Sequence, residues 1–327
     1  MSLHVVIVTP ALADANNGNW QTAQRWARFL AGTCSVRLVK SWPDAEAARD
    51  QAMIALHARR SAASIAAWHE VHGSRGLGVV LTGTDLYRDI ERDSVSRHSL
   101  DAAHRLAVLQ ELGPRALPAE YRAKTKVIFQ SATSRRALSK TRSHLRVVAV
   151  GHLRAEKSPE TLCAAARLLG TASDIAIDHI GAALDPALGE LANATMRDCP
   201  RYRWLGGLPH RSTRDRIQRA HVLVHCSSME GGAHVIMEAV ASGTPVIASR
   251  IDGNVGMLGG DYVGYFPWGD AAALATLLRT CRAGQSDDRN GLLSKLALQC
   301  HCRSSLFDPV HERDAVRALV EDLRAGP

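Results

Sequence analysis

Two carboxylates stand eight residues apart in an otherwise apolar stretch of the sequence. Residues 227–249 read SSMEGGAHVIMEAVASGTPVIAS and contain Glu230 and Glu238. The pattern predicts a turn, a helix over 233–242 and a short strand, with Glu230 at the helix entrance and Glu238 about two turns later. Eight helical residues leave a net rotation of roughly 80° and a rise of roughly 12 Å, so both carboxylates can contact one elongated ligand at separate points.

Three small residues follow the first carboxylate. Gly231, Gly232 and Ala233 would bring backbone amides to the positive end of the predicted helix, where a phosphate group is favoured. An ordinary structural interpretation of the two carboxylates stays open. The helix dipole favours a glutamate at a helix start, and the second glutamate is then merely exposed.

A basic loop is the second feature with chemical potential. The segment GHLRAEKSPETL carries Arg154 and Lys157 directly after an apolar strand pattern and before a helix pattern. Two cations three residues apart at such a position can neutralise the charge of a diphosphate leaving group. Taken alone, the segment is also typical of a loop of surface charges. The two features together, in this order on one half of the chain, point to a nucleotide-sugar site.

The elements that must position these residues alternate along the chain. Apolar runs predict buried strands, and apolar residues at helical spacing predict helices between them. In the N-terminal half, strands are expected within 4–10, 34–40, 52–58, 77–85, 104–110 and 126–130, and helices within 20–31 and 59–72. Strands that alternate with helices indicate an α/β fold with a parallel, doubly wound sheet.

The pattern restarts near residue 146, after the polar and basic segment 131–144. The restart predicts two Rossmann-like domains that face each other, with ligands beyond the carboxyl ends of the strands. The expected boundaries are 1–145 for an acceptor-binding domain, 146–306 for a nucleotide-sugar-binding domain and 307–327 for a C-terminal helix that crosses back to the first domain.

Composition limits the class of protein. The chain has 327 residues, seven scattered cysteines without a CxxC pair, a net charge of +8 and 5% aromatic residues. We expect a cytoplasmic enzyme, because the apolar runs are too short to span a bilayer. We expect no bound metal or other cofactor, because the sequence has no CxxC or Asp-x-Asp pair and free thiols are favoured over a metal site for the one cluster, CHC at 300–302. The basic charge suits anionic ligands, whereas the absence of a base-stacking motif argues against nucleic acid. Nothing in the sequence fixes the oligomeric state.

The two motifs resemble those of the retaining GT-B glycosyltransferases of the family 4 type. Their E-x7-E signature matches Glu230 and Glu238, and their Arg-x-x-Lys pair matches Arg154 and Lys157. The resemblance implies that Glu238 binds the ribose of the nucleotide, that Glu230 binds hydroxyls of the donor sugar, and that the two cations bind the pyrophosphate.

Several further blocks are similar to the SenB-type selenosugar synthases of selenoneine biosynthesis. These blocks are EGGAH in place of the Glu-Gly-Phe-Gly of the general family, NNGNW, IALHARRSA, LTGTDLYRD, ALDPAL, RYRWLG and SRIDGNVGMLGGDYVGYFPWGD. The resemblance implies transfer of selenophosphate to the anomeric carbon of UDP-glucose or UDP-N-acetylglucosamine, which gives a 1-selenosugar. Selenophosphate is already an anion with a nucleophilic selenium, so the site needs no base for the acceptor.

Acceptor-binding residues are expected in loops at the ends of the N-terminal strands. Each candidate also has an ordinary role open to it, as a turn, a buried strand end, a solvated helix face or a helix cap. The candidates are Asn17, Gly18 and Asn19 in the first loop, His57, Arg59 and Arg60 in the second, and residues 82–87 in the third, followed by Arg88. Arg59, Thr84 and Asp85 are foremost, and Asp85 is expected at the reacting atoms.

The segment IDGNVGMLGG completes the predicted donor side. It follows a strand, and we expect a loop in which Gly253 permits a close approach of the backbone to the donor and Asn254 donates a hydrogen bond to it. A plain turn is the alternative.

Two other functional classes remain open from the sequence. One is a family 4 glycosyltransferase with a lipid or cell-envelope acceptor, which a basic surface suits at anionic membranes. The other is a nucleotide-binding module without enzymatic activity. That class has no use for Glu230, which the resemblance assigns to the donor sugar.

Overall fold

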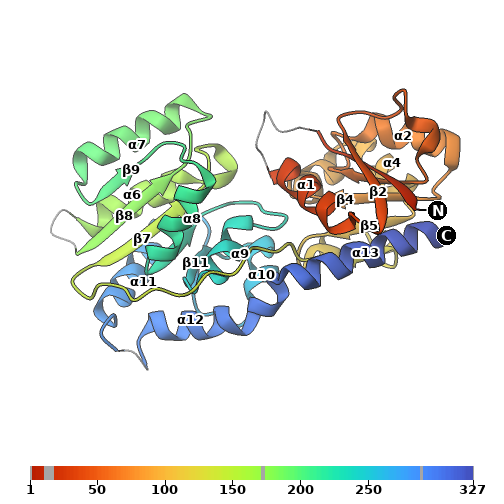
Figure 1. Ribbon diagram of the computed structural model, residues 1–327. Coiled ribbons are helices and arrows are strands. Elements are labelled where there is room, and N and C mark those ends of the chain that lie inside the picture. The colour runs from red at the N-terminus through yellow and green to blue at the C-terminus, as the bar shows by residue number, and fades with distance from the viewer. Residues whose placement is uncertain (1, 11–17, 171–173, 288–289, 327) are drawn as a thin grey trace. The chain divides into compact units, whose positions relative to one another are not determined.

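The computed structural model describes residues 2–10, 18–170, 174–287 and 290–326. The chain divides into two compact units (Figure 1). The first unit consists of Met1–Ser131 and Pro309–Pro327, and the second of Ala132–Asp308. Each unit contains a parallel sheet with helices, which confirms the predicted α/β organisation.

The sheet of the first unit has the strand order β2-β1-β3-β4-β5-β6 in its described residues. All of its neighbouring pairs are parallel, so successive strands are joined by crossovers. The strands are β1 (Leu3–Val8), β2 (Cys34–Val39), β3 (Ala52–Leu56), β4 (Leu77–Leu81), β5 (Arg105–Val108) and β6 (Thr125–Val127). The helices are α1 (Gly18–Leu30), α2 (Ala62–His72), α3 (Ile90–Arg92), α4 (Ser94–Ala102), α5 (Ala119–Arg122) and α13 (Pro309–Ala325).

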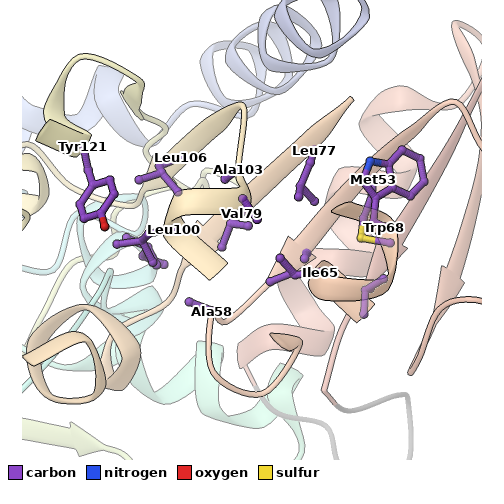
Figure 2. Packing of buried hydrophobic residues seen from close by; sticks show 14 of the residues in the cluster. Met53, Ala58, Ile65, Trp68, Leu77, Val79, Leu100, Ala103, Leu106 and Tyr121 are labelled. Atoms are coloured by element: carbon purple, nitrogen blue, oxygen red, sulfur yellow. The ribbon is translucent and has the colours of Figure 1, made fainter. Parts of the chain in front are cut away.

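Alternate residues of each strand point to opposite faces of this sheet, and helices bury both faces. On one face, Met53 and Val79 pack with Ile65 and Trp68 of α2 and with Leu100 of α4, and Figure 2 shows these side chains together. On the other face, Val5, Ile7 and Ile54 pack with residues of α1 and α13 (Trp26, Leu30, Val316, Leu319 and Leu323). The unit therefore needs α13, although this helix begins more than 180 residues after the end of β6 in the sequence.

A buried carboxylate fixes α13 in place. Glu312 is 1% exposed, and its oxygens accept hydrogen bonds from Arg25 Nε at 2.8 and 3.0 Å and from Trp26 Nε1 at 2.7 Å. Ser131 donates two more, from its backbone N at 2.7 Å and from its Oγ at 2.6 Å. One side chain thus joins α1, the last residue before the second unit and the returning C-terminal helix.

The second unit repeats the plan, with the strand order β12-β11-β10-β7-β8-β9 in its described residues and all neighbouring pairs parallel. Its strands are β7 (Leu145–Val150), β8 (Ile175–Ile180), β9 (Tyr202–Trp204), β10 (Val222–His225), β11 (Val246–Ser249) and β12 (Tyr265–Phe266). Its helices are α6 (Pro159–Leu169), α7 (Pro186–Asp198), α8 (His210–Arg219), α9 (His234–Val240), α10 (Asp252–Leu258), α11 (Ala271–Ala283) and α12 (Leu292–Arg303).

Two local features differ from the sequence analysis. The chain passes to the second unit after Ser131, not after residue 145, because the segment 132–144 is bonded to that unit, as by Arg135 N to Ala241 O at 2.7 Å. The expected loop over 251–260 is largely the helix α10, which starts at Asp252 and ends before Gly259, a residue with φ of 95°. Its glycines had masked the helical pattern.

None of the helices in the described ranges is long and apolar enough to cross a lipid bilayer.

Removal of the Glu312 carboxylate should destabilise the first unit strongly. Glu312→Ala leaves buried donors on Arg25, Trp26 and Ser131 without their acceptor, so we expect a loss of about 3–5 kcal/mol in the free energy of unfolding. Urea unfolding followed by tryptophan fluorescence measures this loss. The control is Asp314→Ala on the same helix, where an exposed carboxylate pairs with the adjacent Arg313 and a change within about 0.5 kcal/mol is expected. Similar losses in both variants would contradict the role given to Glu312.

Candidate active site

The carboxyl ends of β7 and β10 bring three charged or titratable side chains of the second unit together. Glu230 Oε1 accepts a hydrogen bond from Lys157 Nζ at 2.5 Å and another from His225 Nε2 at 3.1 Å. Lys157 and Glu230 are 73 residues apart in the sequence. The sequence analysis placed each of them in a ligand site but did not predict that they form a pair.

Local structure explains this arrangement. β7 and β10 are paired in parallel, so both chains leave the sheet at the same edge. After β7, a short 3₁₀ turn, Ala155–Lys157, presents Lys157, and β10 ends on His225 itself. The loop that carries Glu230 is tied to this turn, because Ser228 N donates to Glu156 O at 2.9 Å.

The electrostatics of the cluster favour an ionised Glu230. Burial alone would raise the pKa of this carboxyl, but the charge of Lys157 and the hydrogen bond from His225 outweigh it and hold the pKa well below its usual range. Burial lowers the pKa of His225, which is fully enclosed, and this effect exceeds the opposing attraction of Glu230. The cluster therefore contains an anionic Glu230, a cationic Lys157 and a neutral His225 that donates through Nε2.

The second predicted carboxylate has its own basic surroundings. Glu238 lies within α9 and is 4% exposed; its Oε1 contacts His210 Nε2 at 2.5 Å, His234 Nε2 at 3.7 Å and Arg214 Nη1 at 3.8 Å. Burial tends to raise the pKa of Glu238, but the His210 hydrogen bond and the nearby His234 and Arg214 side chains lower it below the ordinary value. The same hydrogen bond raises the pKa of His210, whose side chain is 70% exposed. This contact is open to exchange with a ligand.

Gly253 is held against the backbone of the first carboxylate. A Cβ atom at Gly253 would lie 2.1 Å from the carbonyl oxygen of Glu230, so no larger residue fits without displacement. The next residue, Asn254, is fully buried, and its amide nitrogen donates to Ser249 O at 2.9 Å and to Ser249 Oγ at 3.1 Å. Gly253 thus positions Glu230. The amide nitrogen of Asn254, which we expected to bind the sugar donor, instead donates its hydrogen bonds to Ser249.

The remaining predicted donor residues differ in exposure. The side chain of Arg154 is 47% exposed, and its Nε lies 3.9 Å from a Glu156 oxygen rather than at Glu230. Gly231 is buried and Gly232 half-buried, in the turn that precedes α9. Ala233 occupies the position before the first helical residue, and its backbone N contacts Met257 Sδ at 3.1 Å.

A separate group of predicted residues comes together in the first unit. His57 has a positive φ of 74°, and its Nε2 lies 3.1 Å from Thr84 Oγ1. Asp85 is fully buried, and its carboxylate accepts hydrogen bonds from the backbone N of Thr82 and Gly83 at 2.8 Å and of Ala58 at 3.1 Å. Asp85 therefore joins the two loops and orients their polar groups. The sequence analysis expected Asp85 at the reacting atoms, but its carboxylate is buried and bonded to the backbone.

The cations predicted beside this group have carboxylate partners or lie on the surface. Arg59 Nε is 2.7 Å from Asp93 Oδ2 and its side chain is 56% exposed, while Arg88 Nε is 3.1 Å from Asp89 Oδ1. Arg60 is exposed, and its backbone N donates to His57 Nδ1 at 3.3 Å.

The first predicted loop is described only in part. Gly18 begins α1 and is exposed, Asn19 follows it half-buried, and Asn17 lies outside the described residues.

Sequence reasoning missed the histidines and the arginine that surround the two glutamates. His225 had a detectable signal, because a polar residue ends an otherwise apolar strand at the edge where ligands bind. His210 and Arg214 had none, since they belong to α8, a polar helix that becomes relevant only when it packs beside α9. Across the described ranges, no group of three or more His, Cys, Asp or Glu is arranged to hold a metal ion.

The contact of Gly253 with Glu230 can be tested by adding one methyl group. Gly253→Ala should lower the free energy of unfolding by about 1–3 kcal/mol, because the methyl group forces the Glu230 backbone or α10 to move. Urea unfolding measures the change. Gly260→Ala is the matched control, since no atom lies within 4 Å of its added Cβ. If the two variants are equally stable, the close approach does not constrain the loop.

Comparison with known proteins supports an assignment for the second half of the chain. Residues 130–281 match the family described as glycosyl transferases group 1. These residues include Arg154, Lys157, Glu230, Glu238 and Gly253. No curated protein matches the sequence.

Solved structures of similar length share the fold. HepE (Alr3699) of Anabaena in complex with UDP and glucose is 14% identical, with a TM-score of 0.76 over 98% of this chain and 99% of that chain. Sucrose-phosphate synthase of Thermosynechococcus elongatus is 17% identical, with a TM-score of 0.76 over 99% and 100% of the two chains. A glycosyltransferase of Rickettsia africae is 12% identical, with a TM-score of 0.74 over 98% of each. The protein thus has the GT-B fold, and its residues 130–281 match the glycosyl transferases group 1 family.

Proposed function

We propose that the protein transfers the sugar of UDP-glucose or UDP-N-acetylglucosamine to selenophosphate and so makes a 1-selenosugar. The observation that carries the donor half of this proposal is the cluster of Lys157, His225 and Glu230 at the carboxyl ends of β7 and β10. It lies within the segment that matches glycosyl transferases group 1. HepE, which has the same fold, has been solved with UDP, with UDP-glucose, and with UDP and glucose.

The donor site divides between the two glutamates. Glu238 accepts hydrogen bonds from the ribose hydroxyls, in place of its contact with the exposed His210, and Glu230 accepts hydrogen bonds from hydroxyls of the transferred sugar. Lys157 and the half-exposed Arg154 neutralise the diphosphate, which is the leaving group. Positive charge at this point stabilises the departing UDP as the bond from the anomeric carbon to its oxygen breaks.

The acceptor half draws on the first unit. His57 and Thr84 present polar atoms, and Arg59 and Arg60 supply positive charge for the anion. Asp85 keeps the two loops in position through its three backbone contacts and does not touch the acceptor. Gly18 and Asn19 at the start of α1 complete this set. The sequence blocks shared with selenosugar synthases support selenophosphate as the acceptor.

The reaction balances with one water molecule. Selenium of selenophosphate attacks the anomeric carbon, a carbon–selenium bond forms, and the carbon–oxygen bond to UDP breaks. Water then cleaves the selenium–phosphorus bond, which releases phosphate and leaves the selenol of the 1-selenosugar. The acceptor enters as an anion, so the first step requires no base.

The transfer is tested directly with the purified protein. We expect UDP release from UDP-glucose or UDP-N-acetylglucosamine only when selenophosphate is present, with a 1-selenosugar detected by mass spectrometry. Thiophosphate should react more slowly because sulfur is less polarisable. Arg59→Ala should raise the KM for selenophosphate more than that for the UDP-sugar, whereas Arg313→Ala on α13 should change neither. Transfer to a lipid or cell-envelope acceptor without selenium would favour the alternative glycosyltransferase and overturn the proposal.

Binding measurements distinguish the roles of the two glutamates. Glu238→Ala should weaken the binding of UDP by about 1–3 kcal/mol, because a hydrogen-bonding partner of the ribose is lost. Glu230→Ala should leave UDP binding nearly unchanged and weaken the binding or turnover of the intact UDP-sugar. Calorimetric titration of both folded variants with UDP and with UDP-glucose provides the comparison. Equal losses for UDP would refute this division of roles.

A further inference from the structure

Lys157 faces two demands that conflict. The proposed function places its ammonium group on the diphosphate of the donor, whereas in the structure Nζ lies 2.5 Å from Glu230 Oε1. The Lys157 side chain is 22% exposed and flexible, so it can turn from one anion to the other. Glu230 is fixed more firmly, because its side chain is 11% exposed and its backbone packs on Gly253.

A carboxylate that loses its cation in such a place becomes costly. An unpaired buried charge destabilises a protein by several kcal/mol, so Glu230 needs another partner when Lys157 leaves. Within the described part of the chain, Lys157 and His225 are the two basic side chains in contact with the Glu230 carboxylate. His225 Nε2 already lies 3.1 Å from the same Oε1, and its side chain is 2% exposed. His225 therefore needs no rearrangement to act as the single basic partner of the Glu230 carboxylate.

We propose that His225 is a positioning residue that holds Glu230 when Lys157 turns to the donor diphosphate, and that His225 takes up a proton in this step. The proposal rests on the proposed function, because it requires a diphosphate ligand. It goes further in that it makes donor binding a proton-coupled event and assigns the proton to one residue.

The surroundings of His225 leave Glu230 and Lys157 as its dominant charges. His179 on β8 and the adjacent Cys226 line the same small cavity of about 20 Å³. Burial lowers the pKa of His179 to about 4 and raises the pKa of the Cys226 thiol, so both are neutral near pH 7. The charge of Lys157 lowers the pKa of His225, and the charge of Glu230 raises it. When Lys157 leaves, its repulsion is lost while the attraction of Glu230 remains, so the pKa of His225 rises.

The cavity provides for the second N–H group of a protonated imidazole. A protonated histidine has two donors, and Nε2 serves Glu230. Ser227 also lines the cavity and is 1% exposed, and its hydroxyl oxygen has no hydrogen-bond partner among the residues that the structure describes. A cavity of about 20 Å³ accommodates one water molecule, which can link this hydroxyl group to the imidazole.

The sign of the pH dependence follows from the direction of this change. The pKa of His225 is higher with donor bound than without it, so binding takes up a proton between the two values and tightens as the pH falls through that range. His225 contributes at most a tenfold change in affinity per pH unit. Displacement of His210 from Glu238 by the ribose lowers the pKa of His210 and has the opposite effect on affinity, so the contribution of His225 is the difference from a variant that lacks this imidazole. UDP-glucose is the suitable probe, because its diphosphate has no group that titrates near pH 7.

Calorimetry at pH 7 in buffers of different ionisation enthalpy measures the protons bound with UDP-glucose. We expect the unsubstituted protein to take up more protons per bound ligand than a variant in which residue 225 cannot titrate. His225→Gln can still donate a hydrogen bond to Glu230 but cannot titrate, so it should bind fewer protons with UDP-glucose than the unsubstituted protein does, and the release from His210 should remain. His179→Gln is the matched control, because His179 lines the same cavity and bonds to Tyr202 at 2.8 Å; its uptake should equal that of the unsubstituted protein.

The outcomes separate this inference from the proposed function. Binding of UDP-glucose with equal proton uptake in the unsubstituted protein and in His225→Gln would overturn the inference and leave the proposed function intact. Failure of the unsubstituted protein to bind either UDP-glucose or UDP-N-acetylglucosamine would overturn both.

Discussion

The returning C-terminal helix depends on the burial of one charge, that of Glu312. The chain leaves the first unit after Ser131 and re-enters it at Pro309, so both crossings lie close in space within that unit. Glu312 bonds to the last residue of the outgoing chain and to two residues of α1, while the apolar face of α13 covers the sheet. The cost of burying a carboxylate is offset here because fixed donors surround it.

A second carboxylate, the partly buried Glu230, differs in how firmly its partners are held. Its donors are a buried histidine and a flexible, partly exposed lysine, so one of its two partners can move. Glu238 resembles it, because its shortest contact is with the mostly exposed His210. The three carboxylates therefore differ in how firmly their partners are held. Fixed donors suit a structural role, and exchangeable donors suit a site that a ligand occupies.

The same distinction applies to Asp85 in the first unit. Its three backbone donors cannot be replaced without opening two loops, so its charge orients His57 and Thr84. The groups that can meet a ligand are those that remain partly exposed, among them Arg59. The position of a charged residue in a loop after a strand is thus a weak indication that it contacts substrate. Its exposure in the folded unit is a stronger one.

Local patterns in the sequence were sufficient for the parallel α/β organisation, for most strands, and for the identity of Lys157, Glu230 and Glu238 as chemically notable residues. These features depend on spacings of a few residues, which the sequence displays directly. Tertiary structure alone decided that Lys157 and His225 share one oxygen of Glu230, that His210 reaches Glu238 and that Arg154 stays apart from this cluster. It also decided that residues 252–258 are helical and that Gly253 touches Glu230. The reason is that the first three facts depend on the register of β7 with β10 and on the packing of α8 beside α9. Such register and packing arise from the burial of many side chains together, which no short segment of sequence encodes.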